Sequence, residues 1–183
     1  MNLTKKEEKN LRFNELSKAL KSKDTKNLSK TLKKIETEDD VRLLKPLIEL
    51  GARNRDESIE LQISKLLFDL KLTKGHSIIM EELENMGPNP FRAVLISTIW
   101  NANIQAMDHL DLIVKLAVEG NFMEAIECLT VIEETEGEIV EEQVLESLLM
   151  LKGYLQKDND NSGKTHIIKD ILAKVEEIER MHQ

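Results

Sequence analysis

Cysteine, aromatic residues, proline and glycine are all scarce in this sequence of 183 residues. Cys128 is the only cysteine, so neither an intrachain disulfide nor a cysteine-based zinc cluster can form. Aromatic residues make up 3% of the chain, so the 40% of hydrophobic residues are mostly Leu, Ile, Val, Met and Ala. This mixture favours helices over strands, in which aromatic residues and Thr are enriched. Seven Gly and three Pro leave few tight turns.

Long hydrophobic runs are also missing. No apolar stretch approaches the roughly 18 residues that can cross a membrane, and residues 1–8 lack the apolar segment of a signal peptide. We therefore expect a cytoplasmic protein without a membrane span. The length fits a single domain, residues 1–183.

Basic residues are absent between Lys115 and Lys152, and the net charge of −8 is unevenly spread. Residues 1–35 hold eleven Lys/Arg and four Asp/Glu, whereas residues 36–183 hold fifteen Lys/Arg and thirty Asp/Glu. Such polarity can steer charged partners. Blocks of like charge are also common on the solvated faces of helices, which is the simpler interpretation.

Apolar residues recur at helical spacing along nearly the whole chain, which predicts ten helices. Asp24, Asp39 and Asn121 are predicted to cap three of them. Pro46 lies inside the third, where it predicts a kink or an offset start. The predicted helices span residues 3–22, 24–36, 39–51, 55–72, 76–86, 90–103, 108–120, 122–135, 138–156 and 163–181.

Four glycines mark an internal repeat: Gly51, Gly87, Gly120 and Gly153 are separated by 36, 33 and 33 residues. Each follows two apolar residues, eight and four positions earlier. These pairs are Leu43 and Leu47, Ile79 and Leu83, Leu112 and Leu116, and Leu145 and Leu149. We therefore expect helix pairs that stack and share a continuous core, with the glycines turning the chain in the left-handed conformation.

The repeats resemble those of HEAT proteins. Residues 41–51 look like the first helix of a HEAT repeat, including its proline, and residues 89–94 look like the start of a second helix. The resemblance covers about residues 36–155 and departs from the family pattern within that range, since the second-helix pattern is poor at residues 55–60 and absent at 121–126. It implies an all-α fold, a short right-handed α-solenoid (a HEAT/armadillo-like superhelix) of about five stacked helix pairs.

In this arrangement residues 1–35 form a basic N-terminal cap pair, residues 36–155 the repeat core and residues 156–183 a C-terminal capping helix. A closed bundle of the same ten helices stays open as an alternative.

No recognisable catalytic or metal motif is present. Residues 158–163 match the first half of an EF-hand loop, but Lys169 occupies the position of the bidentate Glu, so we expect a polar loop. Residues 162–165 end like a P-loop but lack its first glycine and its preceding strand. The four histidines lack metal-ligand spacing, and Cys128 is expected to be a half-buried structural thiol. We predict no enzyme, no cofactor and no metal site.

The favoured function is that of a non-enzymatic scaffold that binds a protein or peptide, with a basic segment as the preferred ligand of the acidic half. In solenoids of this type the second helices line the concave face. The candidate contact residues are Arg92, Trp100, Asn101, Glu133, Glu134, Glu138 and Glu141. For Trp100, core packing is the competing interpretation.

Three other functions stay open. Residues 1–35 interleave Lys with Leu and could bind nucleic acid or an anionic surface, although nucleic acid is the less favoured partner. An enzyme built from dispersed carboxylates is a weaker hypothesis. Self-association of the basic segment with the Glu-rich stretch of another copy is the third.

Overall fold

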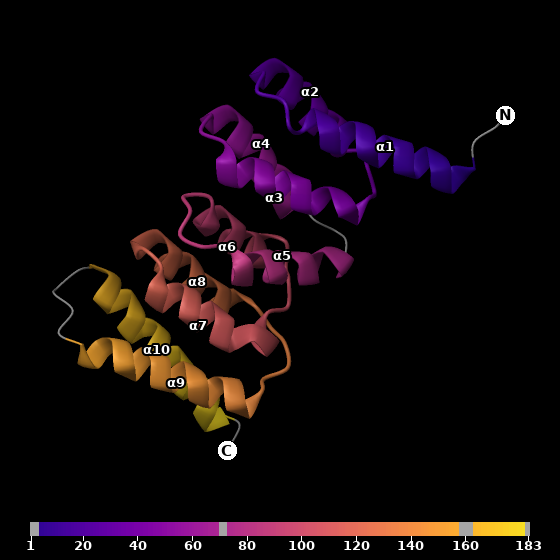
Figure 1. The fold of residues 1–183 in the computed structure, drawn as a ribbon. Coiled ribbons are helices and arrows are strands. Elements are labelled where there is room, and N and C mark those ends of the chain that lie inside the picture. Colours follow the sequence, from indigo (N-terminus) through magenta and orange to yellow (C-terminus); the bar gives the residue numbers. More distant parts are fainter. Residues whose placement is uncertain (1–3, 70–72, 158–162, 182–183) are drawn as a thin grey trace. The chain divides into compact units, whose positions relative to one another are not determined.

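The computed structural model describes residues 4–69, 73–157 and 163–181, and this part of the chain is helical without any strand (Figure 1). The all-α prediction is confirmed, and each predicted helix overlaps an observed one. The helices are α1 (Lys5–Ala19), α2 (Thr25–Ile35), α3 (Leu44–Arg53), α4 (Glu57–Phe68), α5 (Thr73–Asn85), α6 (Arg92–Asn101), α7 (Leu110–Glu119), α8 (Phe122–Glu134), α9 (Glu141–Gln156) and α10 (Gly163–Met181). Two 3-10 helices, η1 (Val41–Leu43) and η2 (Met107–His109), precede α3 and α7. None of the described helices is both long and apolar enough to span a membrane.

Polar side chains cap the starts of several helices, two of them as predicted. The carboxylate of Asp24 accepts a hydrogen bond of 2.9 Å from the backbone N–H of Lys26, which confirms the predicted cap of α2. Asn121 caps α8 as predicted, and Glu124 completes a reciprocal capping box with it. These bonds satisfy N–H groups that have no partner within the helix.

The third helix starts differently from the prediction. Asp40, not Asp39, is the cap: its carboxylate accepts a 3.2 Å bond from the N–H of Arg42 and begins η1. The offset start predicted from Pro46 is confirmed, since Pro46 lies in the first turn of α3, where an N–H has no helical acceptor.

The helix contacts divide the chain into two compact units, Met1–Asn85 and Met86–Gln183, and each is considered by itself. In the first unit α1 packs against α2 and α3 against α4, while α2 also contacts α4 and α3 contacts α5. From α4, Ile59, Ile63 and Leu67 point into this core with no exposed surface. Their spacing of four residues places them on one face of the helix.

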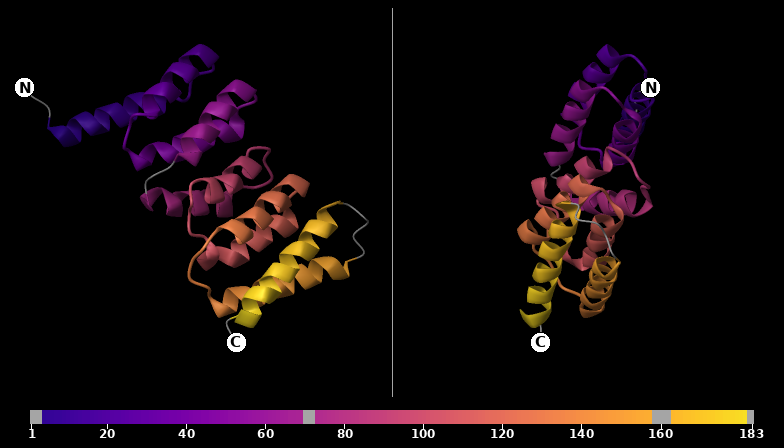
Figure 2. Two further views of the ribbon diagram at one scale, coloured as in Figure 1. Left: turned by 180° about the vertical axis from the view of Figure 1, so that it is seen from behind. Right: turned by 90° about the vertical axis from the view of Figure 1, so that its left-hand side faces the viewer.

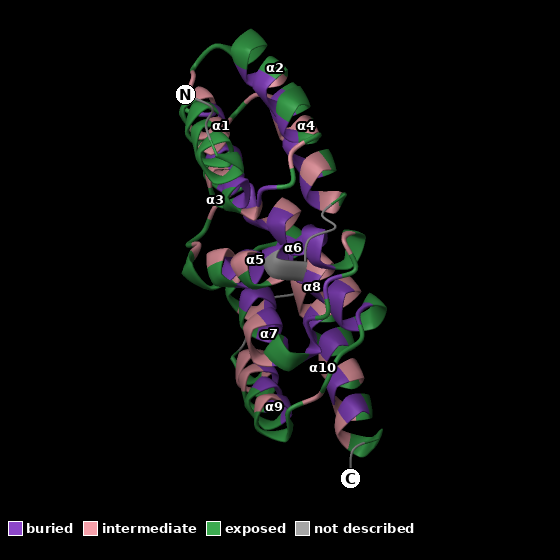
Figure 3. Ribbon diagram, turned by 90° about the vertical axis from the view of Figure 1, so that its right-hand side faces the viewer, coloured by how far each residue is buried: buried purple, intermediate pink, exposed green. Residues whose placement is uncertain are grey.

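The second unit has two layers of helices. α7 and α9 form one layer, and α6, α8 and α10 form the other, with α7 against α8 and α9 against α10 (Figures 1 and 2). Figure 3 shows the exposed residues on the outer sides of the helices and the buried ones between them. Fully buried residues such as Leu95, Val114, Cys128 and Val175 form the core. Burial of each Leu or Val side chain contributes roughly 1.5–3 kcal/mol to the free energy of folding.

The predicted left-handed turns at the repeating glycines are wrong. Gly51 and Gly153 lie within α3 and α9, and Gly120 has φ −75° and an extended ψ. Among the described glycines only Gly137 has a positive φ, 154°. The recurring glycines therefore lie in the last turn of a helix or just after it, and they do not make left-handed turns.

Candidate binding site

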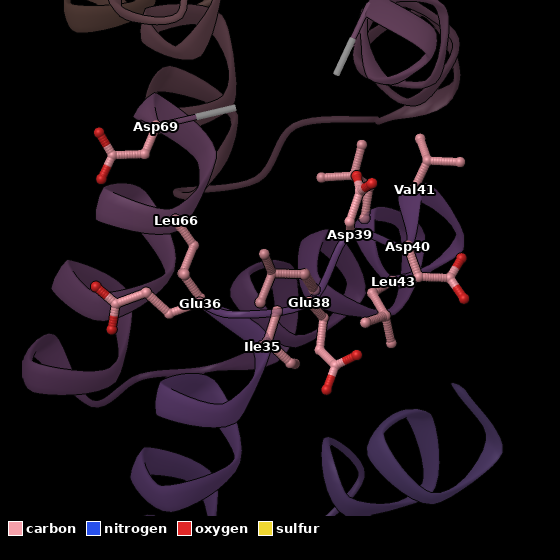
Figure 4. A pocket seen from close by; sticks show the side chains of 11 residues that line it. Ile35, Glu36, Glu38, Asp39, Asp40, Val41, Leu43, Leu66 and Asp69 are labelled. Carbon is pink, nitrogen blue, oxygen red and sulfur yellow. The ribbon is translucent and has the colours of Figure 1, made fainter. Parts of the chain in front are cut away.

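A hollow of about 380 Å³ lies in the first unit, where the chain passes from α2 to α3 (Figure 4). The chain leaves α2 at Ile35, crosses residues 36–40 and enters η1 at Val41. The last turn of α4 forms another wall with Leu66 and Asp69. Every residue that lines the hollow belongs to this unit.

Apolar side chains form the floor of the hollow. They are Ile35, Val41, Leu43, Leu44, Leu47 and Leu66. Val41 and Leu66 are half-buried and therefore accessible to a ligand, whereas the other four are buried. An apolar side chain that covered this floor would gain about 25 cal/mol for each Å² removed from water.

Carboxylates surround this floor. Glu36, Glu38, Asp39, Asp40 and Asp69 all line the hollow, and Figure 4 shows their side chains spread around it without meeting at one point. Accordingly, no group of three His, Cys, Asp or Glu side chains among the described residues could hold a metal ion. The arrangement suits a ligand that carries several separated positive charges.

Three of the five carboxylates already have a cationic partner. Glu38 pairs with Arg12 at 2.7 Å, and Glu36 pairs more loosely with Lys65 at 3.6 Å. Asp40 pairs with Arg42, which is described next. The other two, Asp39 and Asp69, form no ion pair within 4.0 Å with any residue that the structure describes.

Asp40 is the most firmly held of these carboxylates. The guanidinium of Arg42 folds back over it, with Nη2 2.6 Å from Oδ2 and Nε 2.9 Å from Oδ1. This hydrogen-bonded partner lowers the pKa of Asp40, although burial opposes the shift. Arg42 is itself placed by Phe13, whose ring centroid lies 4.6 Å from its Cζ, and by the side chain of Asn10 at 2.8 Å.

Arg92, a predicted contact residue, is buried and forms part of the core of the second unit. Its Nε lies 2.6 Å from Oε1 of Glu124 and its Nη2 3.1 Å from Oε2, so the ion pair is bidentate. Its Nη1 also donates to the carbonyl oxygen of Met86 at 3.3 Å. The prediction that Arg92 meets a partner is therefore wrong, because a guanidinium enclosed by these acceptors is not presented at the surface.

The ion pair belongs to a larger buried network. Burial raises the pKa of Glu124, but hydrogen bonds from Arg92 and from the N–H of Asn121 outweigh it, so the net shift is downward. Lys164 of α10 donates to the carbonyl oxygens of Val118 and Gly120 at 2.7 and 2.6 Å, and burial lowers its pKa.

Cys128 lies close to this network and is completely buried, where we expected half-burial. Burial raises the pKa of its thiol well above the ordinary value, so the thiol stays protonated. It is not placed to act as a nucleophile.

The other six predicted contact residues lie near the surface of the second unit. Trp100 is 37% exposed, and its indole N–H donates to Oε2 of Glu127 at 3.0 Å, which joins α6 to α8. Asn101 follows it at the end of α6 and is exposed. Their role as partner contacts stays a prediction.

The four acidic candidates lie at the end of α8 and around the start of α9, and all are exposed: Glu133, Glu134, Glu138 and Glu141. Glu133 pairs with Lys174 at 3.8 Å. No described hydrogen bond or ion pair joins any of the predicted contact residues to another. The EF-hand-like loop falls on residues 158–162, outside the described part of the chain.

Sequence reasoning missed the hollow. Its one visible signal is the acidic run Glu36, Glu38, Asp39 and Asp40, which directly precedes the apolar start of the third helix. The contribution of α4 could not be read from the sequence, because Leu66 and Asp69 join the site only through tertiary packing.

The chain matches no family model, no curated protein and no solved structure. The function is therefore inferred from the hollow and from the charged surfaces.

Proposed function

We propose that this chain is a non-enzymatic protein-binding module, built as a short α-solenoid similar to HEAT and armadillo arrays. The layering of helix pairs supports this architecture: within the second unit α7 and α9 lie in one layer and α6, α8 and α10 in the other. In the first unit α2 stacks on α4 and α3 on α5 in the same manner. Such arrays present extended surfaces suited to peptides and protein segments.

The observation that carries the proposal is the hollow with its apolar floor and acidic surround. It fits a short protein segment in which an aliphatic side chain is flanked by Lys or Arg. The aliphatic side chain would cover Val41 and Leu66, and the flanking cations would approach Asp39 and Asp69. These carboxylates have no ion-pair partner among the described residues.

The strength of this contact can be bounded. Burying one aliphatic side chain contributes roughly 1.5–3 kcal/mol, and two exposed ion pairs add about 0–1 kcal/mol each. The sum is about 1.5–5 kcal/mol before the entropy cost of association is subtracted, so the Kd is no tighter than roughly 0.2 mM. The hollow alone therefore supports weak, transient binding, and a tight partner must also contact surfaces outside it.

The test is nuclear magnetic resonance titration of the full chain, which detects weak binding residue by residue. The probe is a synthetic peptide with two leucines between pairs of lysines. We expect backbone shifts confined to residues 35–47 and 66–69. A peptide with Ser in place of Leu measures the purely electrostatic part, and one with Glu in place of Lys should not bind.

Two variants separate the contribution of the carboxylates to peptide binding from that of the apolar floor. Asp39→Asn with Asp69→Asn should weaken binding by about 3–10-fold, since each exposed ion pair is worth at most about 1 kcal/mol. The matched control changes two exposed acids of α5, Glu81→Gln with Glu84→Gln, and should leave binding unaltered. Leu66→Ser removes part of the floor and should abolish the preference for Leu over Ser. Chemical-shift changes outside residues 35–47 and 66–69, or equal binding of the Leu and the Ser peptide to the parent chain, would contradict the proposal.

A further inference from the structure

Two oppositely charged helix faces remain without partners in the described part of the chain. The first lies on α2 and consists of Lys26, Lys30, Lys33 and Lys34, here named the lysine face. The second lies on α9 and consists of Glu141, Glu142, Leu145, Glu146 and Leu149, here named the α9 outer face. All nine side chains are exposed.

The lysine face is formed by the amphipathic pattern of α2. Leu28, Leu32 and Ile35 are buried on one side of the helix, which packs against α4. Successive helical residues are about 100° apart, so the four lysines fall within an arc of roughly 100° on the opposite side. None of them forms an ion pair with a described residue.

Acidic residues are scarce in the segment that leads into and contains the lysine face. From Lys18 to Lys34 the chain has seven lysines and a single acid, Asp24. The carboxylate of Asp24 is engaged in capping α2.

The α9 outer face is unusual because it exposes a leucine, Leu149, at a position that is buried in the other repeats. Leu149 is 73% exposed, whereas its counterparts Leu47 and Leu116 are 2% and 4% exposed. α3 has α5 alongside it and α7 has α9, but the described helices that pack against α9 are α7 and α10. The side of α9 that carries Leu145 and Leu149 is therefore not covered by another of the described helices.

The carboxylates and the exposed leucines of the α9 outer face together indicate which side chains could cover it. Glu141, Glu142 and Glu146 form no ion pair with a described residue, so they leave a negative surface around Leu145 and Leu149. A lysine side chain suits both parts, because its methylene stem can lie on a leucine while its ammonium reaches a carboxylate.

We propose that the lysine face of one copy of this chain binds the α9 outer face of a second copy. The contact joins two different surfaces, so a pair of copies retains one free surface of each kind and longer chains of copies can grow. The proposal does not depend on the hollow, because none of the residues that line the hollow belongs to either face. Attraction between the faces is electrostatic and should weaken steeply with salt.

The first measurement is sedimentation of the full chain, freed of nucleic acid, over a range of concentrations. At about 0.02 M salt, where the Debye length is roughly 20–30 Å, the average mass should rise above the monomer value of 21.0 kDa with concentration. At about 1 M salt it should return to the monomer.

The decisive test uses two variants that each lose one surface. Lys30→Glu with Lys33→Glu brings the net charge of the lysine face from +4 to 0, and Glu142→Lys with Glu146→Lys changes that of the α9 outer face from −3 to +1. Each variant alone should be monomeric. Mixed together they should form a one-to-one dimer of twice the monomer mass that grows no further, since each contributes the surface that the other lacks.

Controls with matched charge changes outside both faces are Lys5→Glu with Lys6→Glu, and Glu119→Lys with Glu136→Lys; both should associate like the parent. Circular dichroism verifies that every variant is folded. A parent chain that stays monomeric at low salt, or variants that stay monomeric when mixed, would overturn the proposal. Retardation of a labelled DNA duplex by a monomeric parent chain would assign the lysine face to nucleic acid and would likewise overturn it.

Discussion

Replacing Arg92 by Met should destabilise the second unit more than any surface substitution. The side chains of Arg92 and Glu124 are only 6% and 3% exposed, so the variant leaves a carboxylate buried beside an apolar group. Removing one partner of a buried ion pair costs about 3–5 kcal/mol. Glu124 keeps the bond from the N–H of Asn121 at 2.6 Å, and Lys164 also favours its charge. We therefore expect a loss near the lower limit, about 3 kcal/mol.

The pH dependence provides an independent check. The pKa of Glu124 is lowered in the folded parent chain, so its ionised form stabilises the fold fully above the unfolded pKa of about 4.3. This contribution is lost as the pH falls through the lower folded value. Without Arg92, burial raises the pKa of Glu124, so the stability difference between the parent and the Arg92→Met variant should be largest near pH 7 and shrink as acid protonates Glu124 first in the variant and then in the parent.

The assay is urea unfolding followed by the fluorescence of Trp100, the only tryptophan, which lies on α6 in the same unit. The control is Lys152→Met, which removes the exposed ion pair with Glu176 in that unit and should cost at most about 1 kcal/mol. If the Arg92→Met variant loses no more than this control, the ion pair is not the strong buried contact argued above.

Three further predictions concern single sites. Gly120→Ala should lower the free energy of unfolding by about 1–3 kcal/mol, measured in urea, because a Cβ there would lie 2.5 Å from the carbonyl oxygen of Leu116. Gly153→Ala lies within α9, where a Cβ would meet nothing inside 4 Å, and should raise it by roughly 0.5–1 kcal/mol. Equal effects of the two substitutions would refute this reasoning. Cys128 should resist a thiol reagent in the native chain and react fully in urea, and rapid native labelling would contradict its burial. Asp24→Ala should lower the stability of the first unit by about 1 kcal/mol, measured by circular dichroism, through loss of the cap of α2; no change would mean that the cap contributes nothing.

The local structure could be predicted because it depends on short-range patterns. The apolar spacing of α4, at Ile59, Ile63 and Leu67, repeats every four residues and is visible in the sequence alone. The caps at Asp24 and Asn121 could be read for the same reason, since a cap needs only the two or three residues that follow it.

Burial of individual side chains could not be predicted in this way. Leu116 and Leu149 occupy the same place in the repeat, yet one is buried and the other is mostly exposed. Their difference depends on which helix lies alongside, and this is a tertiary contact. Arg92 was similarly misjudged, because its partner Glu124 lies 32 residues further along the chain.

The hydrogen bonds of Lys164 have a consequence for the order in which the chain folds during synthesis. The carbonyl oxygens of Val118 and Gly120, at the end of α7, accept hydrogen bonds from a side chain that is made 44–46 residues later. As the chain leaves the ribosome, α7 and α8 can pair at once, but the end of α7 is completed only when the start of α10 emerges. A nascent chain that stalls before residue 164 should therefore expose this helix end to water and to chaperones, whereas the pairs of the first unit are already complete.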